Sequence, residues 1–117
     1  MSADSRESPN ARLFALAAMQ CRPGAARLAD DALATDLAVL PGWERAGDTI
    51  RKTFRFADYH ATIAFVNRVA AIANEEDHHP DLSVHYDHCV VTYSTHSAGG
   101  VTRSDCICAA KVERLAG

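Results

Sequence analysis

Apolar and polar residues along the chain follow two periods, and the period distinguishes expected helices from expected strands. A first amphipathic helix is expected before residue 41, because Leu33, Leu37 and Leu40 recur at helical spacing. Asp30 or Asp31 can cap its start. A Pro-Gly pair follows the last leucine and is typical of a helix end.

Two pairs of shorter segments are rich in strand-forming residues and predict two hairpins. Residues 43–46 and 49–56 flank Gly47-Asp48, a dipeptide typical of a tight turn. Residues 82–86 and 89–95 are joined in the same way by a short polar turn. The strands of consecutive hairpins pair most simply into an antiparallel sheet.

A long helix is expected between the two hairpins, with Asp58 as its cap. Its expected buried face consists of residues that recur every three or four positions: Tyr59, Ile63, Val66, Val69 or Ala70, and Ala73. Thr102, with Asp105 three residues later, resembles a capping box and predicts a last helix through Leu115. The order α-β-β-α-β-β-α predicts an α+β fold, a four-stranded antiparallel sheet with helices packed on one face.

Length and charge limit the domain organisation and the classes of partner. The chain has 117 residues, which is enough for one domain with its own core. We expect residues 25–117 to form this domain and residues 1–24 to be a loosely ordered N-terminal extension. A net charge of -3 and a pI near 6.0 argue against a surface that binds nucleic acid or an anionic membrane. No apolar run approaches the roughly 18 residues of a membrane span.

The cysteine spacing favours a reduced, cytoplasmic protein. No two of the cysteines have the CxxC spacing of a zinc or redox pair: Cys21, Cys89, Cys106 and Cys108. Cys106 and Cys108 are two positions apart in the expected last helix, so their side chains point in different directions. We therefore expect no bound metal at these cysteines and no disulfide that the fold requires.

Histidines gather in one short segment: His78, His79, His85, His88 and His96. Imidazole gives or takes a proton near neutral pH, so such a cluster suggests acid-base catalysis or metal binding. No HExxH motif completes a metal site, and two adjacent histidines are poorly placed to bind one ion. A group of surface histidines near a loop, without a role in function, is the remaining alternative.

One spaced pattern runs through this segment: His78-His79-Pro80, then Tyr86, His96 and Asp105. It resembles the signature of the pterin-4a-carbinolamine dehydratase family, also known as dimerisation cofactors of a homeodomain transcription factor. The resemblance runs from about Trp43 to the C-terminus. Two positions depart from the pattern. The usual acidic residue four positions before the first histidine is Asn74, and the frequent cysteine two positions after the third is Ala98.

The resemblance implies that the protein is a hydro-lyase that dehydrates 4a-hydroxytetrahydropterin, such as 4a-hydroxytetrahydrobiopterin, to quinonoid dihydropterin. This step recycles the cofactor of aromatic amino acid hydroxylases. Loss of water requires a proton delivered to the 4a-hydroxyl and one taken from ring N5, which imidazoles supply without a metal or cofactor. We expect His79 and His96 to be the acid-base pair and His78 to support the leaving hydroxyl.

Further residues are expected to bind the substrate: Asp77, Pro80, Glu75, Asp105 and Trp43. Asp77 would orient an imidazole or bond the amino-pyrimidine side of the pterin, while Pro80 would fix the turn. Glu75 would replace the missing carboxylate through a small helix rotation, unless that carboxylate is dispensable. Asp105 has an alternative role as a helix cap. Trp43 has an alternative role as a core residue.

The resemblance also implies partners. We expect a homodimer or homotetramer, and an aromatic amino acid hydroxylase is the candidate metabolic partner. The alternative function is a protein-binding module that acts as a dimerisation or transcriptional cofactor, although retention of all signature histidines favours the enzyme. A histidine-rich metal binder is the third hypothesis. His85 and His88 match nothing in the pattern and are expected to be bystanders, and Tyr86 is expected in the sheet core.

Overall fold

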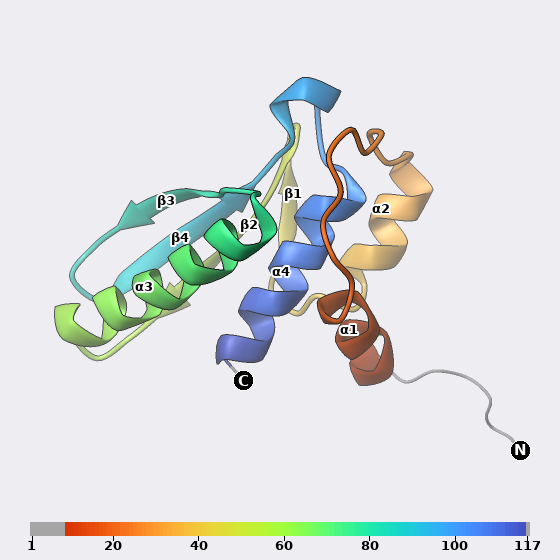
Figure 1. Ribbon diagram of the computed structural model, residues 1–117. Coiled ribbons are helices and arrows are strands. Elements are labelled where there is room, and N and C mark those ends of the chain that lie inside the picture. The colour runs from red at the N-terminus through yellow and green to blue at the C-terminus, as the bar shows by residue number, and fades with distance from the viewer. Residues whose placement is uncertain (1–8, 117) are drawn as a thin grey trace, which may run out of the picture.

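The computed structural model describes residues 9–116 of the chain (Figure 1). Its elements, in chain order, are α1 (Pro9–Ala17), α2 (Asp30–Leu37), β1 (Glu44–Ala46), β2 (Thr49–Arg55), α3 (Tyr59–Glu76), β3 (Asp81–Val84), β4 (His88–Tyr93), the short 3-10 helix η1 (His96–Ala98) and α4 (Arg103–Ala116). From α2 onward the order is the predicted one, with η1 added between β4 and α4.

The strands form one four-stranded sheet in the order β1-β2-β4-β3. All neighbouring strands are antiparallel, and the two hairpins are joined through the central pair β2 and β4. Cys89, Val91 and Tyr93 alternate along β4 and are fully buried, whereas the residues between them are half-buried. This alternation is typical of a sheet with one packed face. The predicted α+β class and antiparallel sheet are confirmed.

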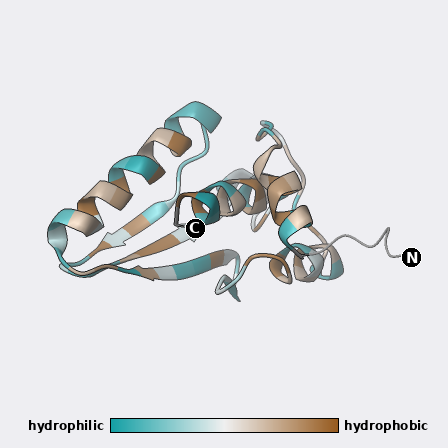
Figure 2. Ribbon diagram, turned by 90° about the horizontal axis from the view of Figure 1, so that it is seen from below, coloured by the Kyte–Doolittle hydropathy of each residue, from teal (hydrophilic) through white to brown (hydrophobic). Residues whose placement is uncertain are grey.

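The helices lie on one side of this sheet. Both α3 and α4 contact β4, and Figure 1 shows α1 and α2 on the side of α4 that faces away from α3. Figure 2 shows one helix lying along a face of the sheet and the other helices beside it, and with the contacts of α3 and α4 to β4 this agrees with the predicted packing. No helix within residues 9–116 is long and apolar enough to cross a membrane.

The cap of α3 is confirmed, and its buried face agrees with the expected one at Val69 and Ala73 only. Asp58 Oδ1 accepts a hydrogen bond from the backbone N–H of Ala61 at 2.9 Å. The buried residues of the helix are Thr62, Phe65, Val69 and Ala73. Tyr59, expected on this face, is 51% exposed. The ring of Phe65 packs against Phe54 of β2 at 4.7 Å between centroids, so Phe65, which was not expected on this face, belongs to the core.

The N-terminal part of the chain differs from the sequence analysis in two ways. Ala29, rather than either aspartate that follows it, occupies the cap position of α2; both aspartates lie in the first turn, where negative charge favours the positive end of the helix dipole. Residues 9–17 form α1, which packs on α4 with Leu16 and Ala17 buried, instead of a loosely ordered segment. Residues 1–8 lie outside the described residues, and the division at residue 25 stays a prediction.

The predicted cap at the start of α4 is present. Asp105 Oδ2 accepts a hydrogen bond from the backbone N–H of Thr102 at 2.8 Å. This is one half of a capping box, in which a side chain in the first helical turn binds the residue before the helix. The carboxylate of Asp105 is thereby fixed at the junction of η1, β4 and α4, with its second oxygen directed elsewhere.

Candidate active site

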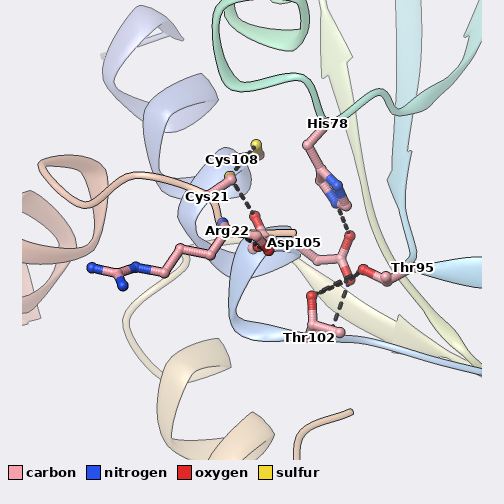
Figure 3. Close-up of polar contacts among 8 residues, drawn as sticks. Cys21, Arg22, His78, Thr95, Thr102, Asp105 and Cys108 are labelled. Atoms are coloured by element: carbon pink, nitrogen blue, oxygen red, sulfur yellow. Dashed lines mark hydrogen bonds and ion pairs between the residues drawn. The ribbon is translucent and has the colours of Figure 1, made fainter. Parts of the chain in front are cut away.

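The two adjacent histidines follow a sharp turn at the end of α3. Asp77 has a left-handed backbone conformation, with φ of 51°, and its N–H donates a hydrogen bond to the carbonyl of Ala73. Aspartate is one of the few residues besides glycine that adopts this conformation readily. The turn directs His78 toward the start of α4 (Figure 3), whereas His79 is exposed at the surface.

His78 binds the buried carboxylate of Asp105. Its Nε2–H donates to Asp105 Oδ1 at 2.6 Å (Figure 3). The other oxygen, Oδ2, accepts from the hydroxyl of Thr95 and the backbone N–H of Thr102, each at 2.8 Å. The side chain of Asp105 is 0% exposed and that of His78 is 16% exposed. A carboxylate with three fixed donors holds one imidazole in one orientation.

The same carboxylate favours the protonated imidazole. The hydrogen bond to Asp105 raises the pKa of His78 above its ordinary value of 6.5, and it outweighs the opposing effect of burial. Negative charge at Asp105, Cys21 and Asp77 acts in the same direction. Tyr93 lies parallel to the His78 ring, with 6.0 Å between centroids. Burial raises the pKa of Tyr93, so its phenol stays neutral beside the imidazole.

A cavity of about 250 Å³ opens beside this pair. Its lining comes from the segment after α1, the end of α3 and the loop between β4 and α4, and includes Cys21, Asp77, His78, Thr95, Thr102 and Ser104. Of the residues that the sequence analysis named as catalytic or substrate-binding, Asp77 and His78 line the cavity, and Asp105 lies behind His78 as its hydrogen-bond partner. The cavity thus offers a proton donor, a carboxylate and hydroxyl groups to a small polar ligand.

His79 has a different environment from His78. Its Nε2 lies 3.3 Å from Asn74 Oδ1, and its side chain is exposed. Asn74 is the position at which the family signature usually has an acidic residue, so the side chain at that position faces His79. Glu75 is exposed. The geometry therefore supports Asn74, rather than Glu75, as the residue that orients His79.

His96 is the first residue of η1 and is exposed. Its neighbours Thr95 and Ser97 both line the cavity, although His96 itself is not among the lining residues. His96 thus lies beside the cavity, on the loop that also supplies the Thr95 hydroxyl to Asp105.

Trp43 and Pro80 do not line this cavity. Trp43 is 6% exposed, and its Nε1–H donates to Glu113 Oε2 at 2.9 Å. Its ring lies 6.1 Å from that of Tyr93 between centroids, inside the core. Pro80 is half-buried and follows the turn. The structure therefore gives Trp43 the core role that the sequence analysis held as the alternative.

The remaining histidines of the cluster lie at the far end of the β3–β4 hairpin. His85 and His88 stack with 4.1 Å between ring centroids, and His88 is the first residue of β4. Tyr86, in the turn between them, is 66% exposed, so its expected place in the sheet core is wrong. Among residues 9–116 no group of at least three His, Cys, Asp or Glu side chains is arranged to hold a metal ion.

Two residues at the cavity were not identified from the sequence. Thr95 donates to Asp105, and the only indication for it was its position directly before a signature histidine. Cys21 lies in a segment that we expected to be loosely ordered, and its contact with α4 joins residues 87 positions apart. No local pattern predicts such a contact.

The sequence model of the family described as pterin 4 alpha carbinolamine dehydratase matches residues 26–115. The chain belongs to this family. The matched region includes His78, His79, His96 and Asp105, and it leaves out Cys21 and the rest of the segment that precedes residue 26.

Individual members of the pterin-4a-carbinolamine dehydratase family are similar over most of the chain. A protein of Chromobacterium violaceum, provisionally named a pterin-4-alpha-carbinolamine dehydratase, is 57% identical over 99 residues, which cover 83% of this chain and 92% of that protein. The crystal structure of a transcriptional coactivator/pterin dehydratase from Brucella melitensis is 33% identical, with a TM-score of 0.75, and the match covers 78% of this chain and 99% of that one.

A second solved structure is more distant. It is described as a pterin dehydratase-like protein that is a RuBisCO assembly factor in the alpha-carboxysome, and it is 26% identical with a TM-score of 0.53. The match covers 64% of this chain and 87% of that one. The same fold thus occurs in proteins that are described as enzymes and in one that is described as an assembly factor, so the residues at the site must decide between the two.

Proposed function

We propose that the protein is a cytoplasmic dehydratase that converts 4a-hydroxytetrahydropterin to quinonoid dihydropterin and water. In this role it recycles the tetrahydropterin cofactor of an aromatic amino acid hydroxylase. The observation that carries the proposal is the His78–Asp105 pair beside a cavity, in a chain of the pterin-4a-carbinolamine dehydratase family. The cavity volume of about 250 Å³ suits a small flat heterocycle better than a larger ligand.

His78 supports departure of the 4a-hydroxyl in this proposal. Because its Nε2–H is bound to Asp105, the other ring nitrogen is the one that can serve the substrate. The raised pKa of His78 favours the protonated imidazole, in which this nitrogen donates a hydrogen bond to the leaving oxygen. The carboxylate of Asp105 stays oriented toward His78, because Thr95 and Thr102 bind its second oxygen.

His79 and His96 are the acid-base pair of the proposal. Both are exposed, so both exchange protons with solvent, and the turnover of a dehydratase requires a group that is reprotonated after each cycle. One delivers a proton to the 4a-hydroxyl and the other takes the proton from ring N5. Asp77, which lines the cavity, is the candidate to bind the amino-pyrimidine side of the pterin. No cofactor is needed for these steps.

The test is a stopped-flow assay with chemically generated 4a-hydroxytetrahydropterin, in which the ultraviolet change reports dehydration. We expect acceleration over the buffer reaction by at least about 100-fold, the lower range for one positioned acid or base. The rate should be the same in EDTA, because imidazoles carry the proton transfers. A rate no faster than buffer would overturn the proposal, and a rate lost in EDTA and restored by zinc would favour a metal site.

A protein-binding role is the second candidate. The Brucella melitensis neighbour is described as a transcriptional coactivator as well as a pterin dehydratase. Strand β3 is an edge of the sheet; Val84 at its end is 39% exposed, and Tyr86 in the turn that follows is 66% exposed. Edge strands with exposed apolar side chains support association, so we include a homodimer or homotetramer in the proposal. Light scattering on the purified protein tests it, and a strict monomer would contradict it.

A further inference from the structure

Two thiols that are distant in the sequence meet beside the active-site cavity. Cys21 Sγ lies 3.3 Å from Cys108 Sγ, although the residues are 87 positions apart. Cys21 follows α1, is half-buried and lines the cavity, whereas Cys108 lies within α4 and is fully buried. Figure 3 shows both side chains beside α4, near the His78–Asp105 pair. Neither thiol has a place in the dehydration proposed above.

Backbone contacts fix the position of Cys21. Its N–H donates to Glu76 Oε1 at 2.8 Å, which ties the segment to the end of α3. Its thiol donates to the carbonyl of Ser104 at 3.4 Å, and the N–H of Arg22 donates to the hydroxyl of the same serine at 3.3 Å. The approach of the two sulfurs therefore results from the way the segment after α1 is bound to α3 and α4.

We propose that Cys21 and Cys108 are a redox site, which forms a reversible disulfide by exchange with a low-molecular-weight disulfide such as oxidised glutathione. A disulfide requires about 2.05 Å between the sulfurs, so the gap must close by about 1.2 Å. The segment that must move is half-buried and lies at the surface side of the pair, whereas α4 is packed in the core.

The environments of the two thiols indicate which of them reacts first. The hydrogen bond from Cys108 lowers the pKa of Cys21, and the positive charge of His78 adds to this effect. The same hydrogen bond and burial raise the pKa of Cys108. Cys21 is also the thiol that lines the cavity, so a dissolved disulfide meets it first. Cys21 is therefore the attacking thiol and Cys108 the resolving thiol.

The exchange balances in two steps. The Cys21 thiolate attacks one sulfur of oxidised glutathione, the glutathione disulfide bond breaks, and one glutathione leaves and takes up a proton. Cys108 then loses its proton and attacks the Cys21 sulfur, and the second glutathione leaves. In total two protein thiols are oxidised to one disulfide, and one oxidised glutathione is reduced to two thiols.

The disulfide would link the segment that begins at Cys21, which forms one wall of the cavity, covalently to α4. Residues 21–25 all line the cavity, and Cys21 begins this stretch. A bond between positions 87 apart also removes much conformational freedom from the unfolded chain. For a domain of this size a disulfide is expected to raise the melting temperature by about 10 °C. The redox state of the pair is thus measurable without an activity assay.

The test equilibrates the full-length protein in buffers of increasing oxidised-to-reduced glutathione ratio, quenches with an alkylating agent and measures the intact mass. We expect a species that has lost two hydrogen atoms, has two alkylated cysteines instead of four, and melts about 10 °C higher. Peptide mapping should link the peptide that contains Cys21 to the peptide that contains Cys108. Reduction with dithiothreitol should reverse all of these changes.

Matched variants identify the pair. Cys106 is a buried cysteine of the same helix, but its side chain faces Asp36. Cys106→Ala should therefore still form the disulfide. Cys108→Ala should leave Cys21 as a stable mixed disulfide with glutathione, and Cys21→Ser, which alters only a half-buried position, should abolish both products. If the wild type accumulates the mixed disulfide and never the internal bond, or stays fully reduced throughout, the proposal is wrong.

Discussion

His78 Nε2 lies 2.6 Å from Asp105 Oδ1 and joins the turn after α3 to the first turn of α4. The same aspartate binds the backbone N–H of Thr102 through its other oxygen. One carboxylate therefore caps a helix and holds an imidazole. The capping role that the sequence analysis gave as the alternative for Asp105 is therefore present, and the other oxygen of the carboxylate remains free to bind His78.

Asp105→Asn removes the negative charge and keeps a side chain of similar shape. We expect the pKa of His78 to fall, since the hydrogen bond to Asp105 is the largest cause of its rise. The dehydration rate near neutral pH should fall by about 10- to 100-fold, because less of the imidazole is protonated. Titration of the histidine resonances by NMR measures the pKa, and stopped-flow measures the rate. An unchanged pKa of His78 would contradict the claim that the carboxylate of Asp105 raises it.

The pH dependence of stability follows from the same pair. The folded-state pKa of His78 lies above the ordinary 6.5, so its contribution is fully present below about pH 6.5 and is lost as pH rises through the folded-state pKa. In Asp105→Asn this pH-dependent part should shrink. Urea unfolding of both proteins across this range measures it, with Asp81→Asn, which changes an exposed aspartate, as the control.

His79→Ala and His96→Ala should each lower the dehydration rate by about 10- to 1,000-fold while the fold and oligomer persist. Both side chains are exposed, so truncation leaves the core intact. The double variant should lose less than the product of the single losses, since both groups act in one transition state. His85→Ala and His88→Ala are the controls, because that pair lies at the far end of the hairpin. Equal losses in the controls would show that the cluster is structural.

Asn74→Ala should lower the rate by about 2- to 10-fold through loss of the hydrogen bond that orients His79, a modest effect for a neutral contact. Glu75→Gln, one position away and exposed, should change little. Asn74→Glu restores the acidic residue usual in the family and keeps an acceptor for His79, so it should not lower the rate. A large loss in Glu75→Gln with none in Asn74→Ala would instead support the helix rotation expected from the sequence.

Local patterns predicted those parts of the fold that local contacts determine. Alternation along residues 49–56 and a dipeptide turn predict a hairpin, and Asp58 and Thr102 predict helix starts, since each needs only its neighbours. The face of α3 was not predictable, because stripes that begin at Tyr59 or at Thr62 both have helical spacing. Its choice depends on the contact of Phe65 with a strand, a tertiary interaction.

The candidate site was predicted in part for the same reason. Spacing and the family resemblance named His78 and Asp105, but nothing local indicates that residues 27 positions apart share a hydrogen bond of 2.6 Å. The packing of α1 on α4 and the approach of Cys21 to Cys108 were missed altogether. Both depend on contacts between the two ends of the chain, which composition and periodicity do not encode.

The stability of the core offers a last prediction, at Glu113. Its Oε2 accepts from Trp43 Nε1 at 2.9 Å and from Lys52 Nζ at 2.7 Å, and its side chain is 9% exposed. Glu113→Ala would leave a buried indole N–H and a partly buried ammonium without this partner. We expect a loss of about 2 kcal/mol in the free energy of unfolding. Glu113→Gln keeps an acceptor for the indole but not the charge, so its loss should be intermediate.

Glu44→Ala is the matched control for that loss. Glu44 pairs with Arg51 at 3.3 Å, but its side chain is 65% exposed and that of Arg51 is 52% exposed. Exposed pairs contribute little, so this variant should stay within about 0.5 kcal/mol of the wild type. Urea unfolding followed by the fluorescence of Trp43, the chain's single tryptophan, measures all three variants. If Glu44→Ala and Glu113→Ala lower the free energy of unfolding by the same amount, the burial of Glu113 does not strengthen its contacts. The hydrogen bond between Trp43 and Glu113 would then not stabilise the core more than an exposed ion pair does.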